Sequence, residues 1–266
     1  MARQTLYRSP HPQVDEWPPR WPEEPLSDEK ARDVFLSACA AIARNLADGG
    51  FRYMRSSQKC RRSCGAFVHS IAFQSSGRNY SGHHVQLWMH AVVSSPDLKA
   101  WRAVALPEKA GVDYVAGGMV HLITPECALV QWELADPRDR AETIEDATAF
   151  IRDRVLPFFA NFDEPSCLVQ TLSERDIPGL DIVRAIEVAL GFEGASAAQR
   201  VLDRCLRDSP LLLKAVQALQ PTDNPESMRE GSYAQQVLYL CQRFALVLPG
   251  NGMPNRPLHP TAFGVG

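Results

Sequence analysis

The feature that most constrains the fold is a change in the spacing of apolar residues along the chain. From residue 67 to residue 93, apolar and polar residues alternate with a period of two, which is typical of half-buried antiparallel strands. After Arg140 the period becomes 3.6 and stays helical as far as residue 249. Strands followed by helices predict an α+β fold, in which an antiparallel sheet precedes an all-helical C-terminal region.

Two strands stand out in the alternating part. The first, in "GAFVHSIAFQSS", has one face made of Phe67, His69, Ile71 and Phe73. The second, in "SGHHVQLWMHAVV", has an apolar face made of Val85, Leu87, Met89, Ala91 and Val93, and a polar-aromatic face made of His84, Gln86, Trp88 and His90. Further along, "GGMVHLI" and "CALVQWEL" predict a hairpin that turns at Thr124–Pro125–Glu126.

Helices are predicted on both sides of the strands. Ahead of them, residues 27–50 have apolar residues at helical spacing, with Ser27 as the N-cap and Gly49–Gly50 as the stop, and this helix should pack on the sheet. Ser95 and Pro96 begin a short helix after the second strand. In the C-terminal part, Thr143 with Asp146 has the pattern of a capping box, and Pro157 should end or kink that helix. Further helices are predicted at 181–192, 195–210, 211–219 and 232–248.

These patterns divide the chain into four parts. Residues 1–26 are predicted to be an extended arm rich in Pro and Trp, and residues 250–266 a disordered tail rich in Gly and Pro. Between them, residues 27–140 form the sheet domain, and residues 141–249 form a helical region packed on it.

Composition narrows the classes of function. The 266 residues carry a formal net charge of −3, so no general positive field attracts nucleic acid. No apolar run is long enough to span a membrane, and the first residues lack the apolar core of a secretory signal. The seven cysteines are scattered and odd in number, which favours reduced thiols in a cytoplasmic protein.

The three histidines of "SGHHVQLWMHAVV" do not predict a metal site. His84 and His90 lie six residues apart on one strand face, about 20 Å at ~3.3 Å per residue, so they cannot share an ion. His83 and His84 are adjacent and point to opposite faces. The face with Trp88 is therefore solvated, covered by the C-terminal helices, or a partner surface.

The segment before the first strand offers two further candidate sites. Cys60 and Cys64, with His69 beyond them, lack the spacing and the fourth ligand of a structural zinc site, and a Cys64–His69 dyad would need a shared cleft. The same segment is a basic run, predicted to be a loop, that suits an acidic partner or a phosphate; its members are Arg52, Arg55, Lys59, Arg61 and Arg62. No nucleotide-binding, serine-hydrolase or zinc-protease motif occurs, so no cofactor is predicted.

Several motifs within residues 31–159 follow one another in a distinctive order. A helix ending in "GGF" precedes an arginine-rich segment, a strand ending in "IAFQSS", the strand "VQLWMHAVV" and then "SPDLKAWR". This order, with Asn79 and Gly82 after "FQSS", resembles an uncharacterised bacterial α+β domain-of-unknown-function family with members near toxin–immunity loci. The resemblance implies the fold and lends no catalytic residues, because none are established for that family. The tail "NRPLHPTAFGVG" is similar to readthrough ends found on mobile gene cassettes.

Together these observations favour a non-catalytic cytoplasmic protein-binding module, of the immunity type, that neutralises a toxin or similar protein partner and binds neither nucleic acid nor membrane. The residues expected to bind the partner are Trp88, His84, Gln86, His90, Arg61 and Arg62. The alternative is a small-molecule enzyme with its site in a cleft between sheet and helices, built from His69, His84, His90 and Cys64. A purely structural role is the third possibility.

Overall fold

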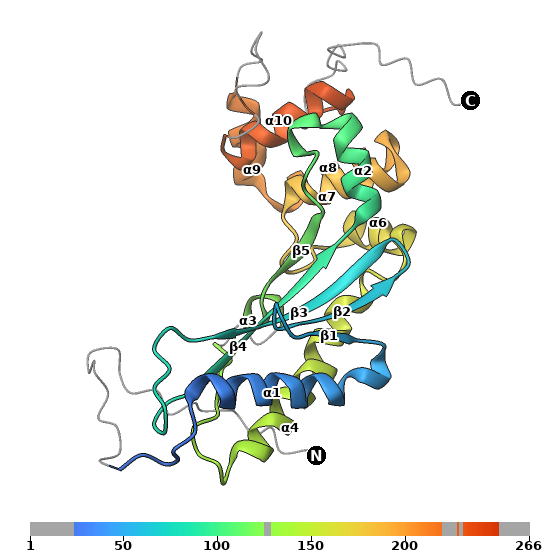
Figure 1. Cartoon of the computed structure of the whole chain (residues 1–266). Coiled ribbons are helices and arrows are strands. Elements are labelled where there is room, and N and C mark those ends of the chain that lie inside the picture. The colour runs from blue at the N-terminus through green and yellow to red at the C-terminus, as the bar shows by residue number, and fades with distance from the viewer. Residues whose placement is uncertain (1–23, 125–128, 220–227, 229–230, 250–266) are drawn as a thin grey trace, which may run out of the picture.

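The computed structural model describes residues 24–124, 129–219, 228 and 231–249. It is an α+β fold in which a helix precedes an antiparallel sheet and further helices follow, as predicted (Figure 1). The strands are β1 (Arg52–Met54), β2 (Lys59–Cys64), β3 (Phe67–Ser75), β4 (Gln86–Ser94), β5 (Tyr114–Met119) and β6 (Trp132–Glu133). They pair in the order β1-β2-β3-β4-β5, and β6 pairs with the first residues of β4.

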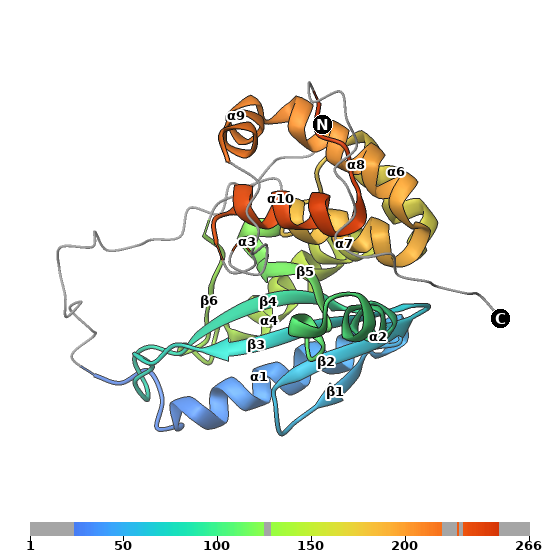
Figure 2. The ribbon, with the colours of Figure 1, turned by 90° about the horizontal axis from the view of Figure 1, so that it is seen from above.

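The helices fall into two groups. Those near the sheet are α1 (Ala31–Asn45), α3 (Val120–Ile123), α4 (Arg140–Phe150) and α5 (Leu156–Ala160). Those at the other end of the molecule are α2 (Pro96–Ala105), α6 (Pro165–Glu174), α7 (Ile182–Glu193), α8 (Ala195–Asp208), α9 (Pro210–Ala218) and α10 (Tyr233–Phe244) (Figures 1 and 2). Within the described ranges, no helix combines the length and apolar character that crossing a bilayer requires.

One face of the sheet, called the inner face, packs against α1, α4 and α5. It has the alternation that the sequence predicts: every second residue of β3 from Phe67 to Phe73 and of β4 from Leu87 to Val93 is buried. Aromatic rings from α5 and from the turn after it close the core, with Phe159 stacked on His69 and Phe162 edge-on to Phe67. The opposite side of the strands is called the outer face.

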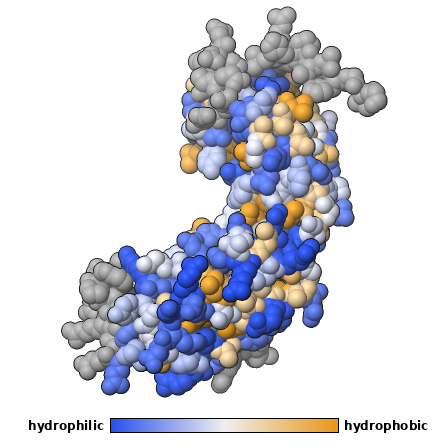
Figure 3. Space-filling view, viewed as in Figure 1, coloured by the Kyte–Doolittle hydropathy of each residue, from blue (hydrophilic) through white to orange (hydrophobic). Residues whose placement is uncertain are grey.

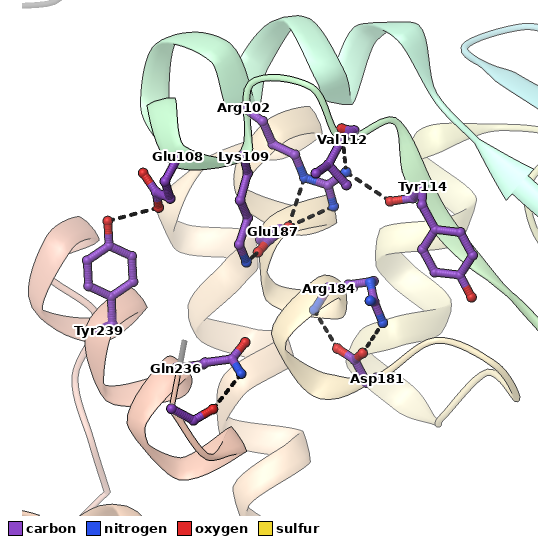
Figure 4. Close-up of polar contacts among 11 residues, drawn as sticks. Arg102, Glu108, Lys109, Val112, Tyr114, Asp181, Arg184, Glu187, Gln236 and Tyr239 are labelled. Atoms are coloured by element: carbon purple, nitrogen blue, oxygen red, sulfur yellow. Dashed lines mark hydrogen bonds and ion pairs between the residues drawn. The ribbon is translucent and has the colours of Figure 1, made fainter. Parts of the chain in front are cut away.

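A buried ion cluster joins α2 to α7 at the helical end. Arg102 of α2 is fully buried, and its Nε and Nη2 donate to the same carboxylate oxygen of Glu187 at 2.9 and 2.7 Å. Its Nη1 donates to the carbonyls of Val112 and Tyr114 at 3.0 and 2.8 Å. Lys109 holds the other oxygen of Glu187 (Figure 4). The cluster thus fixes the chain between α2 and β5 onto α7.

Two predicted helix starts are wrong. Helix α1 begins at Ala31 with no side-chain cap from Ser27; instead the Ala31 amide donates to Ser81 Oγ, 50 residues away, at 3.0 Å. Helix α4 begins at Arg140, so Thr143 lies inside the helix and donates to the carbonyl of Asp139. A tertiary contact thus marks the start of α1, whereas α4 starts with local hydrogen bonds ahead of the predicted cap. Other local predictions hold: Ser95 caps α2, and Pro157 follows a π-helical turn (Ile151–Val155) that interrupts the helix.

Two predictions about strands are also wrong. The expected hairpin does not form, because residues Val120–Ile123 turn into α3 and Trp132–Glu133 pairs with β4 rather than β5. The basic run is not a loop but contains β1 and β2. Its strand pattern is hidden in the sequence because the inward positions of β2 are Cys60, Arg62 and Cys64. Helix α6 has no counterpart among the predicted elements. Most of the predicted arm, the tail and the turn of the hairpin lie outside the described residues.

Candidate partner-binding face

The outer face of the sheet carries the polar-aromatic residues that the sequence places there. Gln86, Trp88 and His90 alternate with the buried residues of β4 and are half-buried. Seen from above, the middle of β3 and β4 has no helix drawn over it, while α2 overlies one end (Figure 2). In the space-filling view the molecule narrows between the helical end and the sheet, which leaves a concave outline on one side (Figure 3). In the view of Figure 2 the C-terminal helices do not cover the middle of the outer face, while α3 brings His121 close to His90 on it.

Trp88 belongs to a small cluster of polar rings and amides, called the aromatic cluster: Trp88, His90, Gln74 and His121. Trp88 is directly opposite Gln74, and His90 Nε2 donates to Gln74 Oε1 at 2.8 Å. Burial, followed by the charge of His121, lowers the pKa of His90 below its ordinary value. Trp88 Nε1 and His121 Nδ1 are shielded from water and make no hydrogen bond. Both atoms are enclosed by the protein, so a partner at this face would meet the exposed part of the Trp88 ring and not its Nε1.

His84 has a structural role at the edge of this face. Its Nδ1 pairs with Glu133 of β6, and Glu133 Oε1 accepts the amides of Val85 and Ala135 at 2.7 and 3.0 Å. Burial alone would raise the pKa of Glu133, but the hydrogen bonds from His84 and from these amides outweigh it and lower the pKa. The pair ties the segment before β4 to β6, in the place of the predicted hairpin.

His69 lies on the inner face, away from the other histidines. It is fully buried, stacks on Phe159 with ring centres 4.6 Å apart, and its Nδ1 accepts from Arg62 Nη2 at 3.2 Å. Burial, and then the charge of Arg62, lowers the pKa of His69 to about 4. Arg62 also lies over the ring of Phe51. Arg62 is therefore part of the inner layer, whereas Arg61 is on the outer face.

Cys64 is not an activated thiol. Its Sγ donates to Asp163 Oδ1 at 3.2 Å, and burial together with the Asp163 carboxylate raises its pKa. Sγ of Cys64 is bound to Asp163 and Nδ1 of His69 to Arg62, so the structure shows no hydrogen bond between Cys64 and His69. The four candidate catalytic residues thus divide between the two sides of the sheet, with His69 and Cys64 on the inner side and His84 and His90 on the outer side. One cleft cannot contain them all.

The same geometry bears on metal binding. Among the residues that the structure describes, no three His, Cys, Asp or Glu side chains are grouped as metal ligands would be, and the cysteines there are free of disulfides. Burial raises the pKa of Cys60 to about 12, which disfavours the thiolate that zinc requires.

We expect protein purified without chelator to contain less than about one-tenth of an equivalent of zinc by elemental analysis. A stoichiometric amount would contradict this, and Cys60, Cys64 and His69 would be the residues to replace.

Two members of the aromatic cluster were not predicted from the sequence. His121 falls in a segment expected to be a strand, and Gln74 reaches His90 only through the register of β3 against β4. The alternation in β3 already places Gln74 on the outer face, but no local signal connects it to His90.

Comparison with protein-family models, curated proteins and solved structures finds no match to the chain, so the family resemblance rests on the quoted motifs alone.

Proposed function

We propose that this chain is a non-catalytic protein-binding module of the immunity type, and that its recognition surface is the outer face of the sheet, centred on Trp88. The observation that carries the proposal is Trp88 itself, a large aromatic side chain that is only half-buried on the outer face of a strand held between β3 and β5. Tryptophan is among the residues that most often dominate binding energy. The separation of the candidate catalytic side chains on two faces favours binding over catalysis.

Replacing Trp88 with alanine should cost at least about 2 kcal/mol of partner affinity, a factor of about 30, while leaving the fold intact. His84→Ala and His90→Ala should each cost less than about 1 kcal/mol, because rim contacts contribute little individually. Tagged wild-type and Trp88→Ala chains are used in parallel to capture proteins from the native host. A protein retained by the wild type alone is then purified and titrated calorimetrically against each variant.

Tyr233→Ala is the matched control, because it removes an aromatic side chain that is 56% exposed at the helical end. It should leave the affinity unchanged. A partner that binds Trp88→Ala as tightly as the wild type would overturn the proposed surface. Turnover of a small molecule that either histidine substitution abolishes, in the absence of any partner, would overturn the proposed class of function.

A further inference from the structure

The outer face of β1 and β2 carries three cations, called the cationic rim: Arg52, Lys59 and Arg61. Arg52 and Arg61 are directly opposite each other in the register, and Lys59 is opposite Met54. All three are exposed, and within the described residues none of them takes part in an ion pair. The rim is therefore a local concentration of unneutralised positive charge in a chain whose net charge is −3.

This arrangement costs stability rather than adding to it. Like charges directly opposite on an antiparallel pair are destabilising, and an acid at either position would remove the repulsion. The register places no Asp or Glu at the outward positions of β1 to β5. Glu133 of β6 faces outward but already pairs with His84 and two backbone amides. The repulsion between Arg52 and Arg61 is thus relieved only by a group from outside the sheet.

Small side chains separate the cationic rim from the aromatic cluster. Arg61 is opposite Ser70, Ser70 is opposite Val92, and Val92 is opposite Gly117. Lys59 is opposite Ala72, which is opposite His90. From Arg61 to Trp88 the offset is two strands and four residues, about 10 Å across the sheet and about 13 Å along it. A partner that contacts both the cationic rim and Trp88 must therefore lie across the small side chains between them.

We infer that the partner surface recognised by this module is acidic, with carboxylates that contact the cationic rim and an apolar group that packs on Trp88. This inference rests on the proposed function and specifies the chemistry of the partner. The rim cations are spread along two strands on an open face, with no backbone amides converging on them, which suits several separate carboxylates better than one phosphate. The face offers a single tryptophan rather than a row of stacking rings, which disfavours single-stranded nucleic acid.

The probe is a fluorescent copolymer of glutamate and tyrosine, which combines carboxylates with an apolar ring. At low salt the wild type should bind it, and binding should weaken as salt is added. Arg61→Glu and Trp88→Ala should each weaken it about tenfold. The matched control is Arg32→Glu, which makes the same charge change at an exposed position of α1, on the opposite side of the sheet. It should change the affinity less than twofold.

Three results would overturn the inference: no binding of the glutamate–tyrosine copolymer, equal losses in Arg61→Glu and Arg32→Glu, or tighter binding of a lysine–tyrosine copolymer or of a single-stranded oligonucleotide. The native partner separates this failure from that of the proposed function. A partner that needs Trp88 but tolerates Arg61→Glu would leave the protein-binding function standing and refute its acidic chemistry. The absence of any partner would refute the function itself, whatever the copolymer does.

Thermal stability provides a second, independent test of the role of Arg61. Because Arg61→Glu replaces a repulsive pair with an attractive one opposite Arg52, the midpoint of thermal unfolding should rise by about 1–2 °C even though probe binding is lost. Differential scanning calorimetry measures the change. A lower midpoint would mean that Arg61 supports the fold, and the loss of binding would then be a structural effect.

Discussion

Replacing Glu187 with glutamine should lower the free energy of unfolding by about 3–5 kcal/mol, the usual cost of removing one partner from a buried ion pair. Glutamine keeps the shape of the side chain and removes its charge. Arg102 is fully buried and Lys109 contacts the same carboxylate, so the substitution leaves two cations facing a neutral amide. Urea unfolding followed by circular dichroism measures the loss.

The matched control is Asp181→Asn on the neighbouring ion pair (Figure 4). Asp181 pairs with Arg184 at the start of α7, where both side chains are partly exposed. Its carboxylate also accepts the Arg184 amide at 2.9 Å, and asparagine caps a helix about as well. The loss should therefore stay below about 1 kcal/mol. Equal losses in the two variants would mean that burial of the Arg102–Glu187 pair is not what makes it important.

The buried cluster of Arg102, Glu187 and Lys109 also connects the helices at this end of the molecule to the sheet. Arg102 donates to the carbonyls of Val112 and Tyr114, at the approach to β5, and Glu187 is on α7. A second link joins α10 to the same segment, through Tyr239 to Glu108 and Arg243 to the carbonyl of Ala105. In Glu187→Gln, amide hydrogen exchange should accelerate first in α2 and α7, while β3 and β4 stay protected.

The fold class was predictable because it depends on local periodicity. The buried residues of β3 and β4 alternate in the sequence, and Ser95–Pro96 begins α2 through short-range chemistry. The strand β2 was not predictable, because its inward positions are thiols and an arginine whose guanidinium lies over Phe51. The start of α1 was missed because its amide is bound by Ser81, a residue that no local pattern connects to it.

The candidate site was predictable only in part, for a similar reason. Trp88 and His90 follow from the alternation of β4. The cationic rim requires the register that sets Arg52 against Arg61, and the aromatic cluster requires the turn that brings His121 to His90. The pair Arg102–Glu187 joins residues 85 apart, and each looks in the sequence like a solvated charge on an amphipathic helix. Contacts between distant residues, rather than propensities, decide these features.

Acidification should destabilise the protein through His69. The pKa of His69 is about 4 in the folded chain and about 6.5 when unfolded, so between these values the unfolded state binds a proton that the folded state refuses. The contribution of His69 to the free energy of unfolding is therefore fully present above pH 6.5. It is lost as the pH drops to 4, by about 3 kcal/mol at 1.36 kcal/mol per pH unit. Below pH 4 both states are protonated and this contribution no longer changes.

His69→Gln isolates this effect, because glutamine does not titrate and its carbonyl can accept from Arg62 as His69 Nδ1 does. Urea unfolding at pH 7 and at pH 4 should show a smaller acid-induced loss in the variant, by about 3 kcal/mol. His90→Gln is the control, since His90 is only partly buried and its shift has the same direction; its effect should be smaller. Equal acid sensitivity in wild type and His69→Gln would mean that His69 takes up its proton while folded. Such a histidine would be an accessible base rather than a neutral core residue, and the case for an enzyme would reopen on the inner face of the sheet.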